Sequence, residues 1–239
     1  MPNLSFEGHQ HRANANDCAG PPQTATLGLT RTISVAFECQ QFKHLRSSMR
    51  HLTLAIATLV LSGCELIPPA DVPPMSAEQK QAVVFDIDGT LTPQDIYVFE
   101  ARPGAANAVS AIAKKGYRVV YITTRIPLYQ SVLPDWLRDN GFPVGSLHVA
   151  QTSEERSDPA GFKAGILDRY KTAGWHLAYA YGDSTTDFEA YAKAGIPRGR
   201  VFALKRRFSR ACADGAYESC LDGWLEHLPY IDREITRAQ

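Results

Sequence analysis

The chain has 239 residues, enough for one sizeable domain, and 44% hydrophobic with 21% charged residues is ordinary for a soluble globular protein. Its formal net charge is zero, and residues 64–239 carry 20 Lys and Arg residues against 22 Asp and Glu residues. A body this close to neutral argues against bulk binding to nucleic acid.

Residues 1–48 contain scattered polar residues and no motif, and we expect them to be a non-native extension upstream of the true start at Met49. A short basic head at 49–51 and a short apolar stretch at 52–61 then form the layout of a secretory signal peptide over residues 49–63. The apolar stretch is about half the ~20 residues that a membrane-spanning helix needs, so we expect no permanent span.

The residues that follow resemble the lipobox of bacterial lipoproteins, with the sequence Leu61-Ser62-Gly63-Cys64. This resemblance implies that Cys64 is acylated, as with palmitate, and becomes the new N-terminus. Glu65 follows it in place of an aspartate, which favours the outer membrane, with the body facing the periplasm of a bacterial cell envelope. Four prolines at 68, 69, 73 and 74 predict that residues 64–80 are a stiff tether without a packed core.

Residues 81–232 alternate strand-like and helix-like segments, the pattern of an α/β domain with a parallel sheet covered by helices. Strands are expected at 82–85, 117–122, 146–150, 177–181 and 201–204. Helices are expected at 103–116, at 128–140, at 162–170 and before Gly195. Pro134 must either kink the second of these helices or mark its first turn.

Charged and hydroxyl side chains follow three of the expected strands. Asp86 and Asp88 end the first strand, and two acids one residue apart either flank a loop over the sheet edge or hold a metal there. The later clusters are Thr123, Thr124 and Arg125 after the second strand, Lys163 near the start of a helix, and Asp183 and Asp187 after the fourth strand. Taken singly, these later residues have structural explanations as strand-end hydroxyls, a solvated lysine, a helix cap and a first-turn acid.

Taken in order, the four clusters resemble the haloacid dehalogenase (HAD) superfamily of phosphotransferases, which implies a HAD-like Rossmannoid three-layer fold. The resemblance implies that Asp86 is the nucleophile, forming an aspartyl phosphate, and that Asp88 is the general acid and base. It implies a Mg²⁺ site made by Asp86, Asp88 through its backbone carbonyl, Asp183 and Asp187. The phosphate-binding residues would be Gly89, Thr123, Thr124, Arg125 and Lys163.

Within this superfamily, residues 82–204 look most like the lipin-type LNS2 phosphatase domain. The matching segments are Asp86–Thr92, the corner at 123–125, Gly161–Lys163, Tyr181–Asp187 and Ala194–Pro197. The chain departs from that pattern with Thr123-Thr124-Arg125 in place of Ser-Ala-Arg, and with Asp183 where several lipin-like sequences have Asn. The resemblance implies a Mg²⁺-dependent phosphatase acting on a phosphorylated substrate such as the phospholipid phosphatidic acid.

The spacing leaves room for only a minimal cap, since residues 90–103 can form a short flap and residues 125–163 hold one helix and one strand. An uncovered site suits a bulky or surface-presented substrate. Three functions remain open: a phosphomonoesterase for phosphatidic acid, nucleotides or small phosphomonoesters, a non-catalytic phospholipid-binding module, and a structural lipoprotein.

Two further features of the body lie after residue 204. A basic cluster of Lys205, Arg206, Arg207 and Arg210 is either a solvated surface or a docking site for anionic lipid. Cys212 and Cys220 are the thiols left in the body once the leader and Cys64 are set aside. Because export places them in an oxidising compartment, we expect them to form a disulfide bond.

Overall fold

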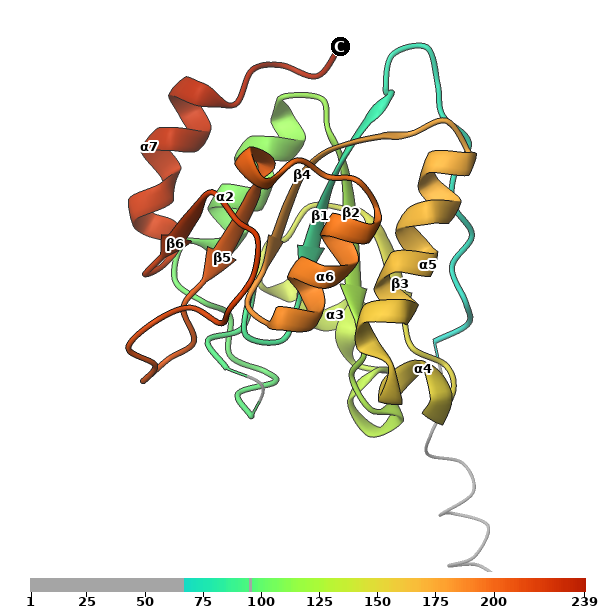
Figure 1. Cartoon of the computed structure of the whole chain (residues 1–239), viewed down its shortest axis with the longest axis vertical. Helices are drawn as coiled ribbons and strands as arrows, with labels where there is room; N and C mark the ends of the chain where they lie inside the picture. Colours follow the sequence, from blue (N-terminus) through green and yellow to red (C-terminus); the bar gives the residue numbers. More distant parts are fainter. Residues whose placement is uncertain (1–66, 95) are drawn as a thin grey trace, which may run out of the picture. The chain divides into compact units, whose positions relative to one another are not determined.

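The computed structural model describes residues 67–94 and 96–239, so the predictions for the leader, the signal peptide and Cys64 lie outside the described residues. The described residues form one six-stranded sheet with the order β3-β2-β1-β4-β5-β6. All neighbouring strands run parallel, and their carboxyl ends meet at one edge, which we call the carboxyl edge (Figure 1). The strands are β1 Gln81–Asp86, β2 Arg118–Thr123, β3 Ser146–Val149, β4 His176–Gly182, β5 Val201–Leu204 and β6 Ser219–Leu221.

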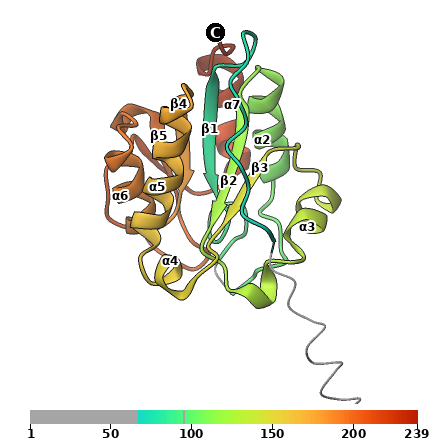
Figure 2. The same ribbon diagram turned by 90° about the vertical axis from the view of Figure 1, so that its right-hand side faces the viewer.

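Helices cover both faces of the sheet and make the three layers that the HAD resemblance implied (Figure 2). One face carries α2 (Ala105–Lys114), α3 (Leu133–Asp139) and α7 (Trp224–Glu234). The other face carries α4 (Ser153–Ser157), α5 (Pro159–Thr172) and α6 (Thr185–Lys193). Two short 3₁₀ turns complete the described elements, η1 (Pro127–Tyr129) and η2 (Arg198–Arg200). No helix within residues 67–94 and 96–239 is long and apolar enough to cross a bilayer.

A row of aromatic rings fixes the central strands beneath one helical layer. Phe85 stacks on Tyr181 with ring centroids 5.2 Å apart, and Tyr181 stacks in turn on Phe202 at 5.2 Å. Trp224 of α7 packs against both Phe85 and Tyr181. Because strand residues alternate between faces, Val84 turns to the second core, under α5 and α6. The first strand is therefore buried on both faces, as its continuous apolar run predicted.

The predicted strands are confirmed within two residues, and the helix predicted over 128–140 is present but begins later, at Leu133, so Pro134 marks its first turn as one of the two alternatives stated. The 3₁₀ turn η1 precedes α3, and residues 130–132 separate the two. Pro134 lies in the first turn of α3, where its missing N–H costs no intrahelical hydrogen bond. The sequence predicted neither α4 nor β6 nor α7.

The described part of the tether differs from its prediction as a segment without packing. Ile67 packs partly against the first core, and its carbonyl oxygen accepts a hydrogen bond of 3.0 Å from Gln151 Nε2. Trp175 Nε1 donates to the Pro73 carbonyl oxygen at 2.9 Å. Prolines lack an N–H but leave carbonyl oxygens free to accept, so this Pro-rich strip docks along the domain. At the other end, the Ala238 N–H donates to the Lys115 carbonyl, so packing continues beyond the predicted limit at residue 232.

Candidate active site

The end of β1 places Asp86 at the centre of the carboxyl edge. The side chain is 3% exposed, and Thr90 Oγ1 donates to Asp86 Oδ2 at 3.0 Å. The chain then turns tightly, because the N–H groups of Thr90, Leu91 and Thr92 all point to the Ile87 carbonyl oxygen. The motif after the strand therefore builds a rigid loop that holds one carboxylate oxygen of Asp86.

Gly89 sits in this loop with a φ of 85°, in the left-handed region. A Cβ atom at this position would lie 2.0 Å from Asp183 Oδ2, so no larger residue fits without moving that carboxylate. The missing side chain therefore lets the loop approach the end of β4, and the phosphate-binding role of Gly89 stays a prediction.

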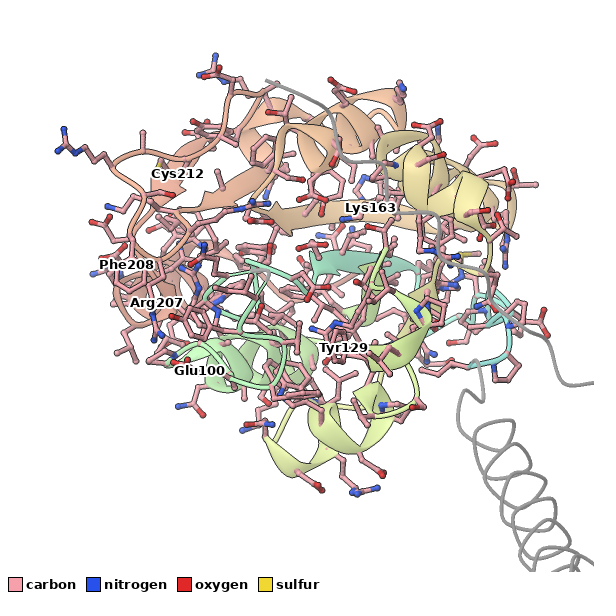
Figure 3. The ribbon with its side chains drawn as sticks, turned by 90° about the horizontal axis from the view of Figure 1, so that it is seen from below. Glu100, Tyr129, Lys163, Arg207, Phe208 and Cys212 are labelled. Carbon is pink, nitrogen blue, oxygen red and sulfur yellow. A yellow bond between two sulfur atoms is a disulfide. The ribbon has the colours of Figure 1, made fainter. Side chains whose placement is uncertain are left out.

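Lys163 joins the two acidic strand ends from the neighbouring helix. Asp158 caps α5 by accepting from the Gly161 N–H, and Pro159 opens the first turn. Lys163 Nζ lies 2.6 Å from Asp86 Oδ1 and is also paired with Asp187. Burial would lower the pKa of Lys163, but Asp187 and Asp86 together raise it above its ordinary value. Figure 3, which looks onto the carboxyl edge, shows Lys163 beside the central strands.

Asp187 serves the start of α6 as well as Lys163. Its Oδ2 accepts from the backbone N–H groups of Asp183 and Ser184, and the Ser184 hydroxyl and Asp187 N–H complete a capping box. Its Oδ1 faces Lys163 Nζ. Burial would raise the pKa of Asp187, but the Lys163 charge and these hydrogen bonds lower it. Both oxygens accept hydrogen bonds, so the helix-cap explanation fits Asp187, and its role as a metal ligand stays a prediction.

Asp183 is the acid that can still accept a further ligand. Its Oδ2 pairs with Arg206, whereas its buried Oδ1 has no hydrogen-bond partner. Burial and the charge of Asp187 raise the pKa of Asp183 to about 7, against the opposing effect of Arg206. Burial and Asp187 likewise raise the pKa of Asp86, which Lys163 opposes. The site therefore holds more negative charge than its own cations offset.

The residues present fit a divalent cation. Oxygen atoms of Asp86, Asp183 and Asp187 lie within 4.8 Å of one another. With all three carboxylates ionised, as they would be around a cation, three negative charges face the two positive charges of Lys163 and Arg206, which leaves a formal net charge of −1. Carboxylate oxygens are the ligands that Mg²⁺ prefers, and the orphaned Asp183 Oδ1 is the atom that an ion would satisfy.

Asp88 forms a separate group with two predicted phosphate-binding residues. Thr123 Oγ1 donates to Asp88 Oδ2 at 2.7 Å, and Arg125 Nη2 lies 2.5 Å from Asp88 Oδ1. Thr123 also accepts from the Arg125 N–H at 3.0 Å, which ties the corner after β2 together. Both residues thus hold Asp88 here, while Thr124 is half-buried beside them.

Three residues of the site had no predicted role in the chemistry: Thr90, Arg102 and Arg206, the last of which was predicted only as part of the basic cluster. Arg102 Nη2 donates to the carbonyl oxygens of Gly89, Pro93 and Lys205, so one buried guanidinium braces the loops after β1 and β5. The sequence offers no signal for Arg102. Arg206 could have been found, because it is the second residue after a strand that ends at the carboxyl edge.

Three members of the predicted basic cluster form ion pairs with different acids. Lys205 pairs with Asp222, Arg206 with Asp183, and Arg207 with Glu100. Arg207 also lies over the Tyr97 ring, 5.0 Å from its centroid. The predicted disulfide bond between Cys212 and Cys220 is present and closes the loop that follows Arg210.

Comparison with known families identifies the domain. Residues 83–205, about half of the chain, match the family model described as "PITM 1-3, LNS2 domain". The chain belongs to the LNS2 domain family. The match begins in β1 and ends just after β5, so it includes every acid of the site.

Curated relatives contain the LNS2-like segment as a small part of much longer proteins. Protein retinal degeneration B of Drosophila melanogaster is 28% identical over 66% of this chain and 12% of its own length. Human membrane-associated phosphatidylinositol transfer protein 3 is 27% identical over 64% of this chain and 16% of its own. Phosphatidate phosphatase PAH1 of Arabidopsis thaliana is 24% identical over 51% of this chain, again 16% of its own. The chain spans 12–16% of the length of these relatives.

A solved structure supports the fold assignment. A HAD-like phosphatase of Mesorhizobium loti superposes with a TM-score of 0.51, at 16% identity over 72% of this chain and 94% of its own. The LNS2 domain described here therefore has the HAD-like α/β fold.

Proposed function

We propose that this LNS2 domain is a Mg²⁺-dependent phosphomonoester hydrolase that works through an aspartyl phosphate on Asp86. The observation that carries the proposal is the pairing of Asp86 Oδ1 with Lys163 Nζ at 2.6 Å inside a cluster with a net negative charge. A phosphomonoester dianion and a carboxylate repel each other, so such a reaction needs cations at this position.

The proposed reaction has two steps carried by two acids. Asp86 attacks phosphorus, a P–O bond forms to its carboxylate, and the P–O bond to the leaving alcohol breaks as Asp88 gives that oxygen a proton. Asp88, now a carboxylate, takes a proton from water, which attacks the aspartyl phosphate and releases inorganic phosphate. Both carboxyl groups return to their starting states, so the cycle balances.

The neighbouring residues hold these two acids in place. Thr90 fixes one oxygen of Asp86, and Lys163 fixes the other while offsetting charge. Thr123 and Arg125 orient Asp88 and would also donate to a phosphoryl group bound at the same edge. Asp86, Asp183 and the backbone carbonyl of Asp88 would hold the Mg²⁺ ion, which would supply further positive charge to the phosphoryl oxygens.

The proposed substrate is phosphatidic acid or another phosphomonoester presented on a surface. Two observations support it: one relative is named a phosphatidate phosphatase, and no cap domain covers the edge among the described residues. Nucleotides and small phosphomonoesters are the alternative substrates. A phospholipid-binding module without catalysis is the alternative function, which the name of the phosphatidylinositol transfer relatives favours.

The test is phosphate release by the purified full chain with Mg²⁺, from para-nitrophenyl phosphate, nucleotides and vesicle-borne phosphatidic acid. We expect release from at least one of these, and the substrate with the highest kcat/KM names the class. An Asp86→Asn variant is the matched control for contaminating phosphatase. If wild type and this variant release equal amounts from every substrate, the hydrolase proposal is overturned.

We further propose, from the sequence alone, where the protein is located. Residues 49–63 are a signal peptide, Cys64 is acylated, and the lipid anchors the chain in the outer membrane facing the periplasm. Metabolic labelling of a bacterial host with a palmitate analogue should mark the wild-type chain. A Cys64→Ser variant should stay unlabelled, and equal labelling of both would remove the anchor from the proposal.

A further inference from the structure

Exposed apolar side chains gather at the carboxyl edge. Among the described residues, nine large hydrophobic side chains are exposed, and six of them lie in the loops that follow β1, β2 and β5. We call these six the apolar rim: Ile96, Phe99, Ile126, Leu128, Val132 and Phe208. The other three are Met75 and Val144, which stand singly elsewhere, and Leu225 in the first turn of α7. Scattered apolar residues are normal on a surface, but a cluster around one opening indicates an interaction site.

Phe208 is the most exposed member of the apolar rim. Its side chain is 84% exposed, and its backbone has a φ of 67°, a conformation that a bulky residue rarely adopts. It therefore combines an unfavourable backbone with an aromatic ring that buries nothing in the fold. Figure 3 shows Phe208 beside Arg207 and Glu100, on one side of Lys163. Strain of this kind at an exposed tip points to a role outside the folded core.

A second part of the apolar rim forms a hollow. Ile96, Tyr97, Val98, Phe99 and Tyr129 line a cavity of about 610 Å³ whose one charged neighbour is Glu100. Arg207 pairs with Glu100 at 2.5 Å and so offsets that charge. The hollow can therefore accept an apolar group without burying an unpaired charge.

The docked tether reaches the domain at the same edge. The Ile67 carbonyl accepts from Gln151, which comes two residues after β3 ends. Cys64 is only three residues before Ile67, so the anchor proposed at Cys64 lies within about 10 Å of this attachment along the chain. A lipid held at that point would bring the carboxyl edge, and not the opposite edge, to the membrane.

We infer that the carboxyl edge lies against a lipid bilayer, with Ile96, Phe99, Leu128 and Phe208 inserted at the interface around the catalytic carboxylates. This inference rests on the proposed function, because it supplies a surface-presented phosphomonoester directly to Asp86. Arg210 is exposed beside Phe208 and suits anionic headgroups. The inserted side chains stand on three loops around the opening, so a bilayer delivers substrate there, whereas a protein seated on the same loops would close it.

The test uses fluorescence at single positions of the full chain. Its three native tryptophans are all buried, so a Phe208→Trp variant adds one surface reporter. Val144→Trp is the matched control, since Val144 is 97% exposed and precedes β3 at the opposite edge. Both variants keep the same leader and anchor. Vesicles of brominated phosphatidylcholine, with and without phosphatidic acid, quench a tryptophan that enters the bilayer.

We expect Phe208→Trp to lose most of its added emission on these vesicles and Val144→Trp to keep it. Equal emission changes in the two variants, or none in either, would overturn the inference, and a protein partner at this edge would give that second result. Quenching requires no turnover. Quenching of Phe208→Trp in a chain that releases no phosphate would leave the docking in place and remove the hydrolase proposal.

A turnover measurement adds an independent result. A Phe99→Ser/Phe208→Ser chain should lose roughly tenfold or more in turnover of vesicle-borne phosphatidic acid, since each apolar side chain contributes about that factor when buried. Its turnover of para-nitrophenyl phosphate should match wild type. Met75→Ser/Val144→Ser is the control away from the carboxyl edge and should change neither rate. Equal turnover of vesicle-borne substrate by both double variants would overturn the inference.

Discussion

Two groups of charged side chains lie at the carboxyl edge, and they differ in their access to solvent. In the inner group, the side chains of Lys163, Asp86 and Asp187 are each at most 5% exposed. In the outer group, the Asp88 side chain is 20% exposed although its partner Arg125 is 2% exposed. Only Ile87 separates Asp86 from Asp88 in the chain, so the end of β1 places one acid in each environment.

The difference indicates a division of labour. A buried carboxylate held by Thr90 and Lys163 cannot move, which suits a nucleophile that must meet phosphorus in one direction. A carboxylate next to solvent can exchange protons with water and with a leaving alcohol. The predictions below test whether the inner group holds the nucleophile in place and whether the outer group exchanges protons. They begin with the largest expected effect.

Asp86→Asn should abolish turnover of whichever substrate proves active, by more than about 10⁴-fold in kcat. An amide is a poor nucleophile, and the change removes a carboxylate from the metal site. Single-turnover phosphate release measures the loss. Activity within a few-fold of wild type would contradict the covalent role of the inner group.

Asp88→Asn should slow both half-reactions by about 10²–10⁴-fold, the usual contribution of general acid–base assistance. Its free energy of unfolding should fall by about 1–3 kcal/mol, because the buried Arg125 loses its counter-charge while the amide oxygen of the new side chain can still accept a hydrogen bond. Steady-state kinetics and urea unfolding on the same preparation check both statements. A large loss of stability with normal turnover would show that Asp88 is structural and not the general acid and base.

Two variants, Lys163→Met in the inner group and Arg125→Met in the outer group, compare the groups by the free energy of unfolding alone. Removing Lys163 leaves two carboxylates buried without their cation and should lower the free energy of unfolding by about 3–5 kcal/mol. Removing Arg125 leaves Asp88 near solvent and should cost only about 1 kcal/mol. Urea unfolding without added Mg²⁺ gives both values, and equal losses would show that the two groups do not differ in solvation.

Local signals predicted the acids of the site, whereas Lys163 follows no strand and was predicted through the HAD resemblance. A buried parallel strand reads as a continuous apolar run, and the residues after three such runs meet at one edge by topology alone. Asp86 and Asp183 directly follow from that rule. The two explanations for Asp187, helix cap and active-site acid, stayed open because one carboxylate serves both purposes here.

The features that sequence could not supply depend on distant or atypical contacts. Arg102 reaches Gly89 and Lys205, 13 and 103 residues away, and no local pattern encodes such a brace. Helix α7 contains Pro229, which argues against a helix when it is seen in sequence alone. Tertiary packing of Trp224 against Phe85 and Tyr181 outweighs that local preference.

The prediction with the smallest expected effect on turnover concerns the loop between β5 and β6, which carries Arg206 near its start. The Cys212–Cys220 bond closes the later part of this loop over a sequence separation of 8. A Cys212→Ser/Cys220→Ser variant should lose about 2–3 kcal/mol of stability, chiefly because the unfolded chain regains conformational freedom. Urea unfolding in the absence of reductant measures the loss.

Turnover should change little in that variant, since Arg206 is the second residue after β5 and Arg102 still binds the Lys205 carbonyl. Dithiothreitol supplies the control: it should lower the stability of wild type by the same amount and leave the double-serine variant unaffected. A wild-type chain that unfolds identically with and without reductant would show that the bond adds no stability. In that case the strand β5 and Arg102, rather than the disulfide, would be what holds Arg206 at the inner group.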